Sequence, residues 1–268
     1  MKTTIIFLSF LFHVQIAWSA EAPLVFELSG QSVVETNLSE LIKKLETHEI
    51  QFYNPQYHKE KSYLAFSIKD LLDLAYQSRW HSTDFSDIAF TALDGYESVS
   101  PLRVFNEGGA FLAYQEIGGD DDWELVGRKQ ANPGPYFLVW TGDQQTTENA
   151  YPWPWQVQKV NLLRFSDIYP AVVPKKVPKN VNPDSSVYAG FTLFKKRCLR
   201  CHAIDQQGGK IGPDLNAPQN ITSYRSKKMI IEIIKHASVY RYTQMPDHTD
   251  LSDQDLENLY LYLKHQSR

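Results

Sequence analysis

The sequence predicts two domains of different class, an α+β domain over residues 20–170 and an all-α domain over residues 185–268. Strand-like and helical apolar patterns are mixed in the first part, whereas only helical patterns occur in the second. Four prolines punctuate the chain between the two parts: Pro170, Pro174, Pro178 and Pro183. Proline at this density cannot continue a helix or a central strand, so we expect an extended Pro/Lys linker over residues 171–184.

The N-terminal domain combines short apolar runs with two stripes at helical spacing. The runs that predict strands are Leu24–Leu28, Ile88–Leu93, Tyr136–Trp140 and Val157–Leu163. The stripes that predict helices are Leu38, Leu41, Ile42 and Leu45, then Ile68, Leu71, Leu72 and Ala75. Asn37 and Ser67 precede these stripes as candidate N-caps, and Glu40 stands at the capping-box position after Asn37. Together these patterns predict an α+β domain.

The C-terminal domain shows three helical segments. We expect helices over Val187–Arg197 and Ser226–Ala237, and a last helix capped by Ser252 with Asp255 at the capping-box position. The apolar face of the middle helix comprises Met229, Ile230, Ile233 and Ile234. The residues expected to point inward from the last helix are Leu256, Leu259, Tyr260 and Leu263.

Composition and charge exclude several classes of protein. The chain has 268 residues, of which 43% are hydrophobic and 22% charged, as in a folding globular protein. Two cysteines are too few for a disulfide-rich scaffold. Residues 20–171 carry a net charge of −11 and residues 185–268 one of +4. This asymmetry indicates steering of a partner, docking of one domain on the other, or ordinary solvation of two unrelated surfaces. We expect no nucleic-acid partner.

The N-terminus has the layout of a secretory signal peptide over residues 1–19. Lys2 supplies the positive charge, Ile5–Phe12 the apolar segment, and Ala17 and Ser19 the small residues before a cut after Ser19. The apolar segment is shorter than the roughly 20 residues of a membrane span, and no other long apolar run follows. We therefore expect a periplasmic protein without a membrane span after signal removal.

Both cysteines of the chain lie in one short motif, Cys198-Leu199-Arg200-Cys201-His202. CxxCH is the covalent attachment site of c-type haem. Thiols on adjacent helical turns can add to two vinyl groups of one porphyrin, and the next residue then turns its imidazole under the iron. The alternatives are a thioredoxin-like dithiol, which needs a βαβ setting, half of a zinc site, which lacks a second cysteine pair, and chance. The motif predicts one covalent haem c.

Residues 185–268 resemble a class I c-type cytochrome. The further segments that carry the resemblance are Gly212-Pro213-Asp214-Leu215, Met245-Pro246, Gly190, Phe194 and Tyr260. The resemblance implies that the Pro213 carbonyl accepts the ring N–H of His202 and that Met245 is the second axial ligand of the iron. It also implies a close crossing of the terminal helices. The rival ligands in this domain are Met229, which we expect in the core, His236 and His248.

Residues 60–168 resemble the molybdopterin-binding domain of the sulfite oxidase family. The segments that carry this resemblance are Phe90–Glu97, Ser100–Leu102, Leu112–Tyr114, Gly134–Trp140 and Val157–Phe165. That family holds its molybdenum with a cysteine thiolate, and residues 20–185 contain no cysteine. The resemblance thus implies a mixed sheet with helices and a relative without the metal, and we do not expect molybdopterin.

Other candidate sites in the N-terminal domain have ordinary explanations. Asp120-Asp121-Asp122 lacks the alternating spacing of a calcium loop and fits a solvated turn. Tyr151-Pro152-Trp153-Pro154-Trp155 could stack a planar ligand or form an aromatic corner packed on the sheet, which we favour. The scattered histidines His48, His58 and His81 indicate no site.

The sequence supports three hypotheses about function. The first is a periplasmic electron carrier, because a His/Met haem iron has no open position for a substrate. Its N-terminal domain would be a docking or recognition module for a redox partner protein. The second is an enzyme whose N-terminal domain oxidises a small molecule and passes electrons to the haem. The third is a ligand-sensing module that gates electron flow.

Overall fold

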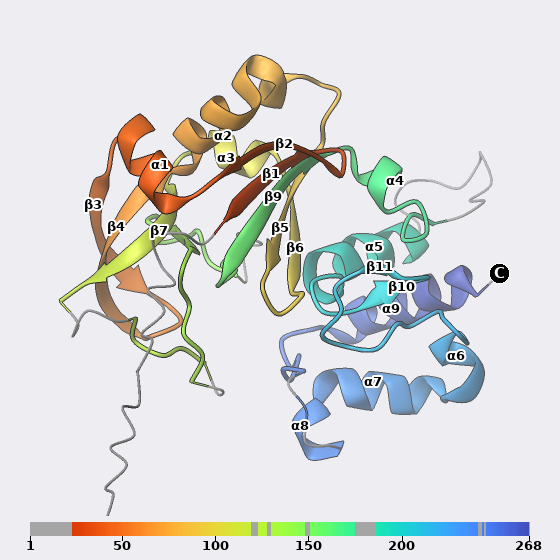
Figure 1. Ribbon diagram of the computed structural model, residues 1–268. Coiled ribbons are helices and arrows are strands. Elements are labelled where there is room, and N and C mark those ends of the chain that lie inside the picture. The colour runs from red at the N-terminus through yellow and green to blue at the C-terminus, as the bar shows by residue number, and fades with distance from the viewer. Residues whose placement is uncertain are drawn as a thin grey trace, which may run out of the picture.

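The computed structural model describes residues 23–118, 123–127, 130–147, 151–174, 186–240, 243 and 245–267. The predicted signal peptide (1–19), residues 175–184 of the predicted linker and the acidic residues Asp120–Asp122 lie outside them. Within the described residues, no helix is both long enough and apolar enough to span a membrane. Figure 1 shows a sheet-rich N-terminal part beside a helical C-terminal part. The predicted fold classes are therefore confirmed at this level.

Two sheets form the N-terminal part. The five-stranded sheet has the order β2-β1-β9-β5-β6, with β1 and β9 parallel and the other pairs antiparallel. Its strands are β1 (Leu24–Leu28), β2 (Gln31–Thr36), β5 (Asp87–Ala92), β6 (Glu97–Pro101) and β9 (Val157–Leu163). The four-stranded antiparallel sheet has the order β3-β4-β7-β8. Its strands are β3 (His48–Asn54), β4 (Lys59–Ser67), β7 (Ala110–Ile117) and β8 (Phe137–Trp140).

Short helices connect and cover these sheets. They are α1 (Leu38–Lys44), α2 (Ile68–Tyr76), α3 (Arg103–Asn106) and α4 (Phe165–Ile168), with a 3-10 turn over Gln77–His81. Asn37 caps α1 as predicted, because its side chain accepts the N–H of Glu40. Ser67 stands at the N-cap position of α2 but makes no side-chain cap bond. Ile42 of the first predicted stripe lies in this helix, with its side chain 49% exposed.

A single apolar cluster fills the space between the two sheets and α2. Its fully buried aromatic residues include Tyr63, Phe66, Phe90, Phe105 and Trp140. Trp153 of the Tyr151–Trp155 segment is 5% exposed and packs into the same cluster, so this segment is the aromatic corner that we favoured. The N-terminal part thus closes its core with its own side chains.

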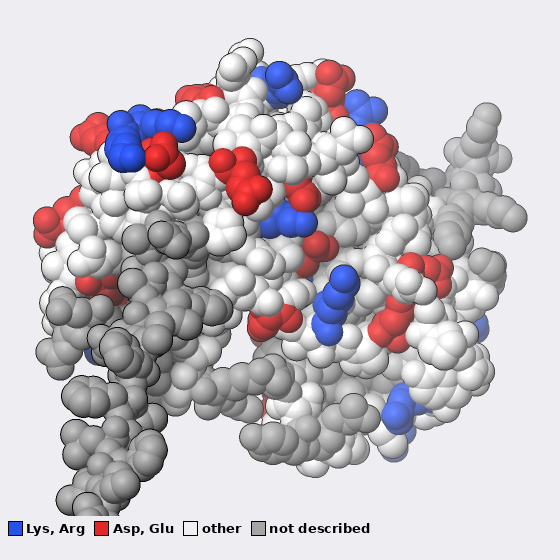
Figure 2. Space-filling view, viewed as in Figure 1, with Lys and Arg blue, Asp and Glu red and all other residues white. Residues whose placement is uncertain are grey.

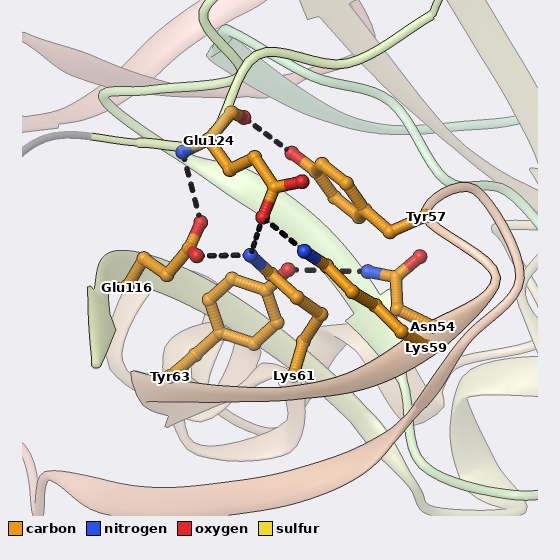
Figure 3. A network of polar contacts seen from close by, with 7 residues as sticks. All are labelled: Asn54, Tyr57, Lys59, Lys61, Tyr63, Glu116 and Glu124. Carbon is orange, nitrogen blue, oxygen red and sulfur yellow. Dashed lines mark hydrogen bonds and ion pairs between the residues drawn. The ribbon is translucent and has the colours of Figure 1, made fainter. Parts of the chain in front are cut away.

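One rim of the N-terminal part holds a buried ion network around Lys61 (Figure 3). The Lys61 side chain is only 5% exposed, and its ammonium contacts the carboxylates of Glu116 and Glu124. Lys59 also pairs with Glu124, at 2.8 Å. A buried ammonium is tolerable only when it is paired in this way, so the network fixes β4 against β7 and the segment that follows β7.

The described residues of the C-terminal part form helices and a small hairpin. Its helices are α5 (Ser186–Leu193), α6 (Ile221–Tyr224), α7 (Lys227–Lys235), α8 (Ala237–Tyr240) and α9 (Asp253–Gln266). A π-helical turn over Phe194–Cys198 follows α5, and β10 (Ala203–Ile204) pairs with β11 (Gln207–Gly208). Ser252 and Asp255 form the predicted capping box of α9.

Helices α5 and α9 cross closely at Gly190. A Cβ placed at Gly190 would clash with the backbone carbonyl of Asn258 and lie 2.8 Å from the Cβ of Tyr262. Phe194 packs against Tyr262, with 5.2 Å between ring centroids and 45° between the ring planes. The aromatic residue at this crossing is therefore Tyr262, and the expectation for Tyr260 was wrong. Tyr260 is only half-buried, whereas Tyr262 is fully buried.

The outer face of the five-stranded sheet packs against the C-terminal part. Along β5, Ile88 and Phe90 point into the N-terminal cluster, whereas Ala89 belongs to a second cluster. That second cluster joins Ala89, Val99, Leu163, Phe165, Tyr169 and Val172 to Phe194, Leu199, Ile204, Leu259, Tyr262 and Leu263. In Figure 1 the β5–β6 hairpin points toward α5 and the β10–β11 hairpin. The two parts therefore share this second cluster, whereas the first belongs to the N-terminal part alone.

The start of the predicted linker is also packed. Residues 170–172 form a turn and residue 173 a bend, rather than an extended spacer, and Val172 is fully buried. The Tyr262 hydroxyl donates a 2.6 Å hydrogen bond to the Val172 carbonyl, and the Gln266 amide donates to the carbonyls of Ala171 and Val172. Helix α9 satisfies the backbone of these residues, which explains why they fold back onto it.

Candidate functional site

The two cysteines lie on a tight turn that follows α5. The π-helical turn delivers Cys198, and the N–H groups of Cys201 and His202 both donate to the Cys198 carbonyl, at 3.0 and 2.9 Å. Both cysteines are free thiols and half-buried. Leu199 lies between them in the sequence. Its side chain is fully buried in the cluster that the two parts share, which anchors the turn. The two thiols are therefore presented from one fixed turn, named below the attachment turn (Cys198–His202).

His202 is held in one orientation by Pro213. Its Nδ1 lies 2.8 Å from the Pro213 carbonyl oxygen, which can only accept, so Nδ1 carries the proton and Nε2 keeps its lone pair. A Cβ at Gly212 would lie 2.6–3.0 Å from the imidazole ring, so only glycine lets the ring lie flat against this loop. The arrangement leaves Nε2 available as a metal ligand with its tautomer fixed.

The loop that contains Gly208 and Gly209 packs closely against the backbone of the attachment turn. Gly209 donates to the Leu199 carbonyl at 2.8 Å, and a Cβ there would clash with the carbonyl of Arg200. Gly208 has φ +125°, and a Cβ there would lie 2.5 Å from the His202 carbonyl. Sequence reasoning missed these positions, although the Gly-Gly pair so soon after the motif was a signal of close backbone approach.

Asp214 fixes the loop that carries Pro213. Its carboxylate accepts the N–H groups of Asp205, Gln206, Asn216 and Ala217, at 2.6–3.2 Å. Burial by itself would raise the pKa of this carboxyl, but the four N–H donors outweigh burial and lower the pKa below its usual value. The ionised carboxylate therefore ties the two sides of the loop together at neutral pH.

A cavity of about 1010 Å³ opens beside the attachment turn. Cys198, Cys201, His202, Pro213 and Met245 all line it, so the structure brings the five predicted site residues around one space. Much of the remaining wall is aliphatic or aromatic: Phe194, Ile211, Leu215, Ile221, Ile230, Ile233, Ile234, Leu259 and Leu263. The volume lies at the upper end of ligand pockets, which span about 300–1,000 Å³.

The rival ligands lie in different places. Met229 is 39% exposed, so the expectation that it is a core residue was wrong. Within the described part of the wall, neither Met229 nor His236 lines the cavity, whereas His248 does. His248 Nδ1 lies 3.5 Å from the guanidinium of Arg197, which also pairs with Asp250 at 2.8 Å. Burial, and next the Arg197 charge, lower the pKa of His248.

Burial keeps the site residues neutral. It raises the pKa of Cys198 to about 12 and raises that of Cys201. Burial also lowers the pKa of His202, although the Pro213 hydrogen bond and Asp214 work in the opposite direction. At neutral pH the site therefore presents two protonated thiols and a neutral imidazole.

This donor set fits a c-type haem. Two thiols on one turn, an imidazole with a free Nε2 and a thioether line one cavity with a largely apolar wall. Among the described residues, no group of three or more His, Cys, Asp or Glu side chains could hold a metal ion by itself. His48 pairs with Asp70 at 4.0 Å and His81 stacks on Trp80, while no contact indicates a site at His58 in the described part of the chain.

The comparisons agree with this geometry for part of the chain. The family model for cytochrome c matches residues 187–267, which is 81 residues and under a third of the chain. A search of curated proteins finds no match. The match does not reach residues 60–168, so the likeness to the sulfite oxidase family stays a prediction. Residues 187–267 form a cytochrome c domain, which implies haem c binding and electron transfer.

Proposed function

We propose that this protein is an exported, periplasmic electron carrier with one covalently bound haem c. Cys198 and Cys201 would hold the porphyrin through two thioethers, and His202 and Met245 would be the axial ligands. When bound, this haem supplies an iron that takes up and gives back one electron at a time. The observation that carries the proposal is the His202 imidazole, which Pro213 fixes with Nε2 free in the cavity that both thiols and Met245 line.

The residues of the chain supply attachment, orientation and burial. Pro213 and Gly212 hold the imidazole plane, and the Gly208-Gly209 loop holds the attachment turn. The aliphatic wall excludes water, which favours the less charged ferrous state and makes Met245 a suitable thioether ligand. Within this proposal the N-terminal domain is a docking or recognition module for a redox partner protein.

We further propose that residues 20–170 are a metal-free relative of the sulfite oxidase-type molybdopterin domain. The quoted segments support this, because they fall on strands that pair: the Asp94-Gly95-Tyr96 turn joins β5 to β6, and β5 pairs with β9. The absence of cysteine from residues 20–185 supports the loss of the metal. Molybdenum near one atom per purified chain would contradict this proposal.

An optical spectrum with metal analysis tests the electron carrier. On protein matured in a bacterial periplasm we expect ferrous c-type bands, about one iron per chain and haem that survives acid extraction. The mature chain should begin at Ala20. Free haem after extraction, or a chain that retains residues 1–19, would contradict the corresponding part of the proposal.

Replacement of Met245 tests the sixth ligand. Met245→Ala should open one iron position, so that the ferrous protein binds carbon monoxide and its reduction potential falls. Met229→Ala is the matched control, because Met229 lies outside the described cavity wall, and it should leave both properties unchanged. If the ferrous Met245→Ala protein does not bind carbon monoxide, His248 becomes the first alternative ligand to test.

A further inference from the structure

The β5–β6 hairpin of the N-terminal part lies directly on the attachment turn. The Glu97 N–H donates a 3.1 Å hydrogen bond to the carbonyl of Arg200, which lies within that turn. On the other side of the hairpin turn, Lys210 donates to the Gly95 carbonyl at 3.4 Å. Gly95 has φ +86°, and a Cβ there would lie 3.6 Å from that of Lys210. The hairpin therefore fits the attachment turn backbone to backbone.

A buried ion pair reinforces this contact. Lys195, in the π-helical turn before Cys198, reaches Asp87 at the start of β5, at 2.5 Å. The Asp87 side chain is only 3% exposed, and its other oxygen accepts the Ser86 hydroxyl at 2.6 Å. The Lys195 ammonium also lies 4.2 Å from the centre of the Phe165 ring. Removal of this lysine would leave the buried carboxylate without a counter-ion, which favours opening of the interface.

The shared apolar core surrounds these polar contacts. Leu199 and Val99 of β6 belong to the same buried cluster, and Phe165 lies 5.8 Å from Phe191 of α5, centroid to centroid. The cavity wall itself includes Thr147 of the N-terminal part. Figure 2 shows acidic and basic side chains close together where the two parts meet on this face. The N-terminal part is thus continuous with the wall of the haem site rather than tethered beside it.

We propose that the β5–β6 hairpin is a positioning element of the haem site, which holds the attachment turn in place and keeps water from it. The inference rests on the proposed function, because the potential that it tunes is that of the haem. A haem held by Cys198 and Cys201 would lie against the turn that carries these thiols. The hairpin covers the outer side of that turn, so its docking controls how much water reaches this side of the haem. Water near the haem stabilises the ferric charge and lowers the reduction potential.

Lys195→Met in the full-length holoprotein tests the proposal. It keeps the apolar stem of Lys195 and leaves Asp87 unpaired. We expect amide hydrogen exchange at Glu97 and Lys210 to accelerate about tenfold or more, because both N–H groups bridge the interface. The reduction potential should fall below that of the wild type. Lys235→Met is the matched control, since Lys235 pairs at 2.7 Å with Asp253, whose side chain is 95% exposed.

A second variant separates docking from charge. Asp87→Asn combined with Lys195→Met removes both charges, so no unpaired charge stays buried and the interface should close again. We expect exchange at Glu97 and the potential to return most of the way to the wild-type values. This variant also keeps the test valid if Lys195→Met alone does not fold.

The outcomes separate this inference from the proposed function. A Lys195→Met protein with the potential of the Lys235→Met control, and with wild-type exchange at Glu97, overturns the positioning role while the haem stays attached. The positioning role is equally overturned if exchange accelerates but the potential equals that of the control. A wild-type chain without covalent haem overturns the proposed function instead, before any variant is compared.

Discussion

The two parts of this molecule build their cores in different ways. The N-terminal part fills its interior with its own aromatic and aliphatic side chains, from Tyr63 and Phe66 to Trp140. The cytochrome c domain surrounds a cavity of about 1010 Å³. Its buried apolar cluster, which includes Phe194, Leu199 and Tyr262, also contains residues of the N-terminal part. We therefore expect the interior of the N-terminal part to be stable without a ligand. The cytochrome c domain, in contrast, should depend for its stability on a bound group and on its contact with the N-terminal part.

Removal of both thiols should produce the largest difference in stability between the two parts. In Cys198→Ala/Cys201→Ala, no thioether can form, so we expect no covalent haem and loss of the cooperative unfolding of the C-terminal domain. The N-terminal transition should persist. Tryptophan fluorescence reports it selectively, because every tryptophan of the chain precedes residue 156. Covalent haem in the double variant, detected by mass spectrometry, would refute the attachment site.

Truncation of a side chain in the N-terminal core should destabilise the N-terminal part and leave the haem site unchanged. Leu138 is fully buried on β8, so Leu138→Ala should cost about 2–5 kcal/mol of N-terminal unfolding free energy. We expect the haem spectrum and potential to stay unchanged, because Leu138 belongs only to the N-terminal cluster. Denaturant unfolding followed by fluorescence measures the loss. A changed haem spectrum would show that the two cores are not separate.

A methyl group at the helix crossing should affect only the C-terminal domain. Gly190→Ala would drive a Cβ into the carbonyl of Asn258, and overpacking of this kind costs about 1–3 kcal/mol. Thr192→Ala, at an exposed position of α5, is the control. The measurement is unfolding followed at the haem absorbance. Equal midpoints for the two variants would contradict the close approach of α5 and α9.

The smallest expected effect concerns pH. The folded-state pKa of Asp214 lies below its usual value of 3.8, so its ionised form stabilises the fold above that pH. This stability is lost as the pH falls through the folded-state pKa. Asp214→Asn keeps one acceptor oxygen but removes the charge, so it should cost about 1 kcal/mol at pH 7, the difference between hydrogen bonds to a charged and to a neutral acceptor, and less below about pH 4. A difference from wild type that grows in acid would contradict this assignment.

Local signals predicted part of the fold well. The strand Val157–Leu163, the N-cap Asn37 and the capping box of α9 follow from short-range patterns and are all observed. Strands β3 and β4 were missed, although buried and exposed residues alternate along β3, which is the period-2 signal of a half-buried strand. Tyr262 was missed because it lies two residues from Tyr260, and a helical pattern this rich in apolar residues does not fix which of the two faces inward.

Long-range contacts could not be read from the sequence. The CxxCH motif predicted the attachment turn, and the family resemblance supplied Pro213 and Met245. Nothing in the chain predicted that Lys195 would meet Asp87, which lies 108 residues earlier. The charge difference between the two parts allowed such docking but equally allowed two unrelated surfaces. The partner of a buried charge is set by tertiary packing, which no local pattern encodes.

Strand β6 lies at the edge of its sheet, and the attachment turn covers part of that edge through the Arg200 carbonyl. A fragment that ends at Pro174 would expose this edge together with the apolar side chains of Val99, Leu163 and Phe165. Open strand edges next to apolar surface pair readily with other chains. The N-terminal part would thus remain folded on its own yet self-associate, so separate expression of the two halves should yield aggregates where the full chain yields a monodisperse protein.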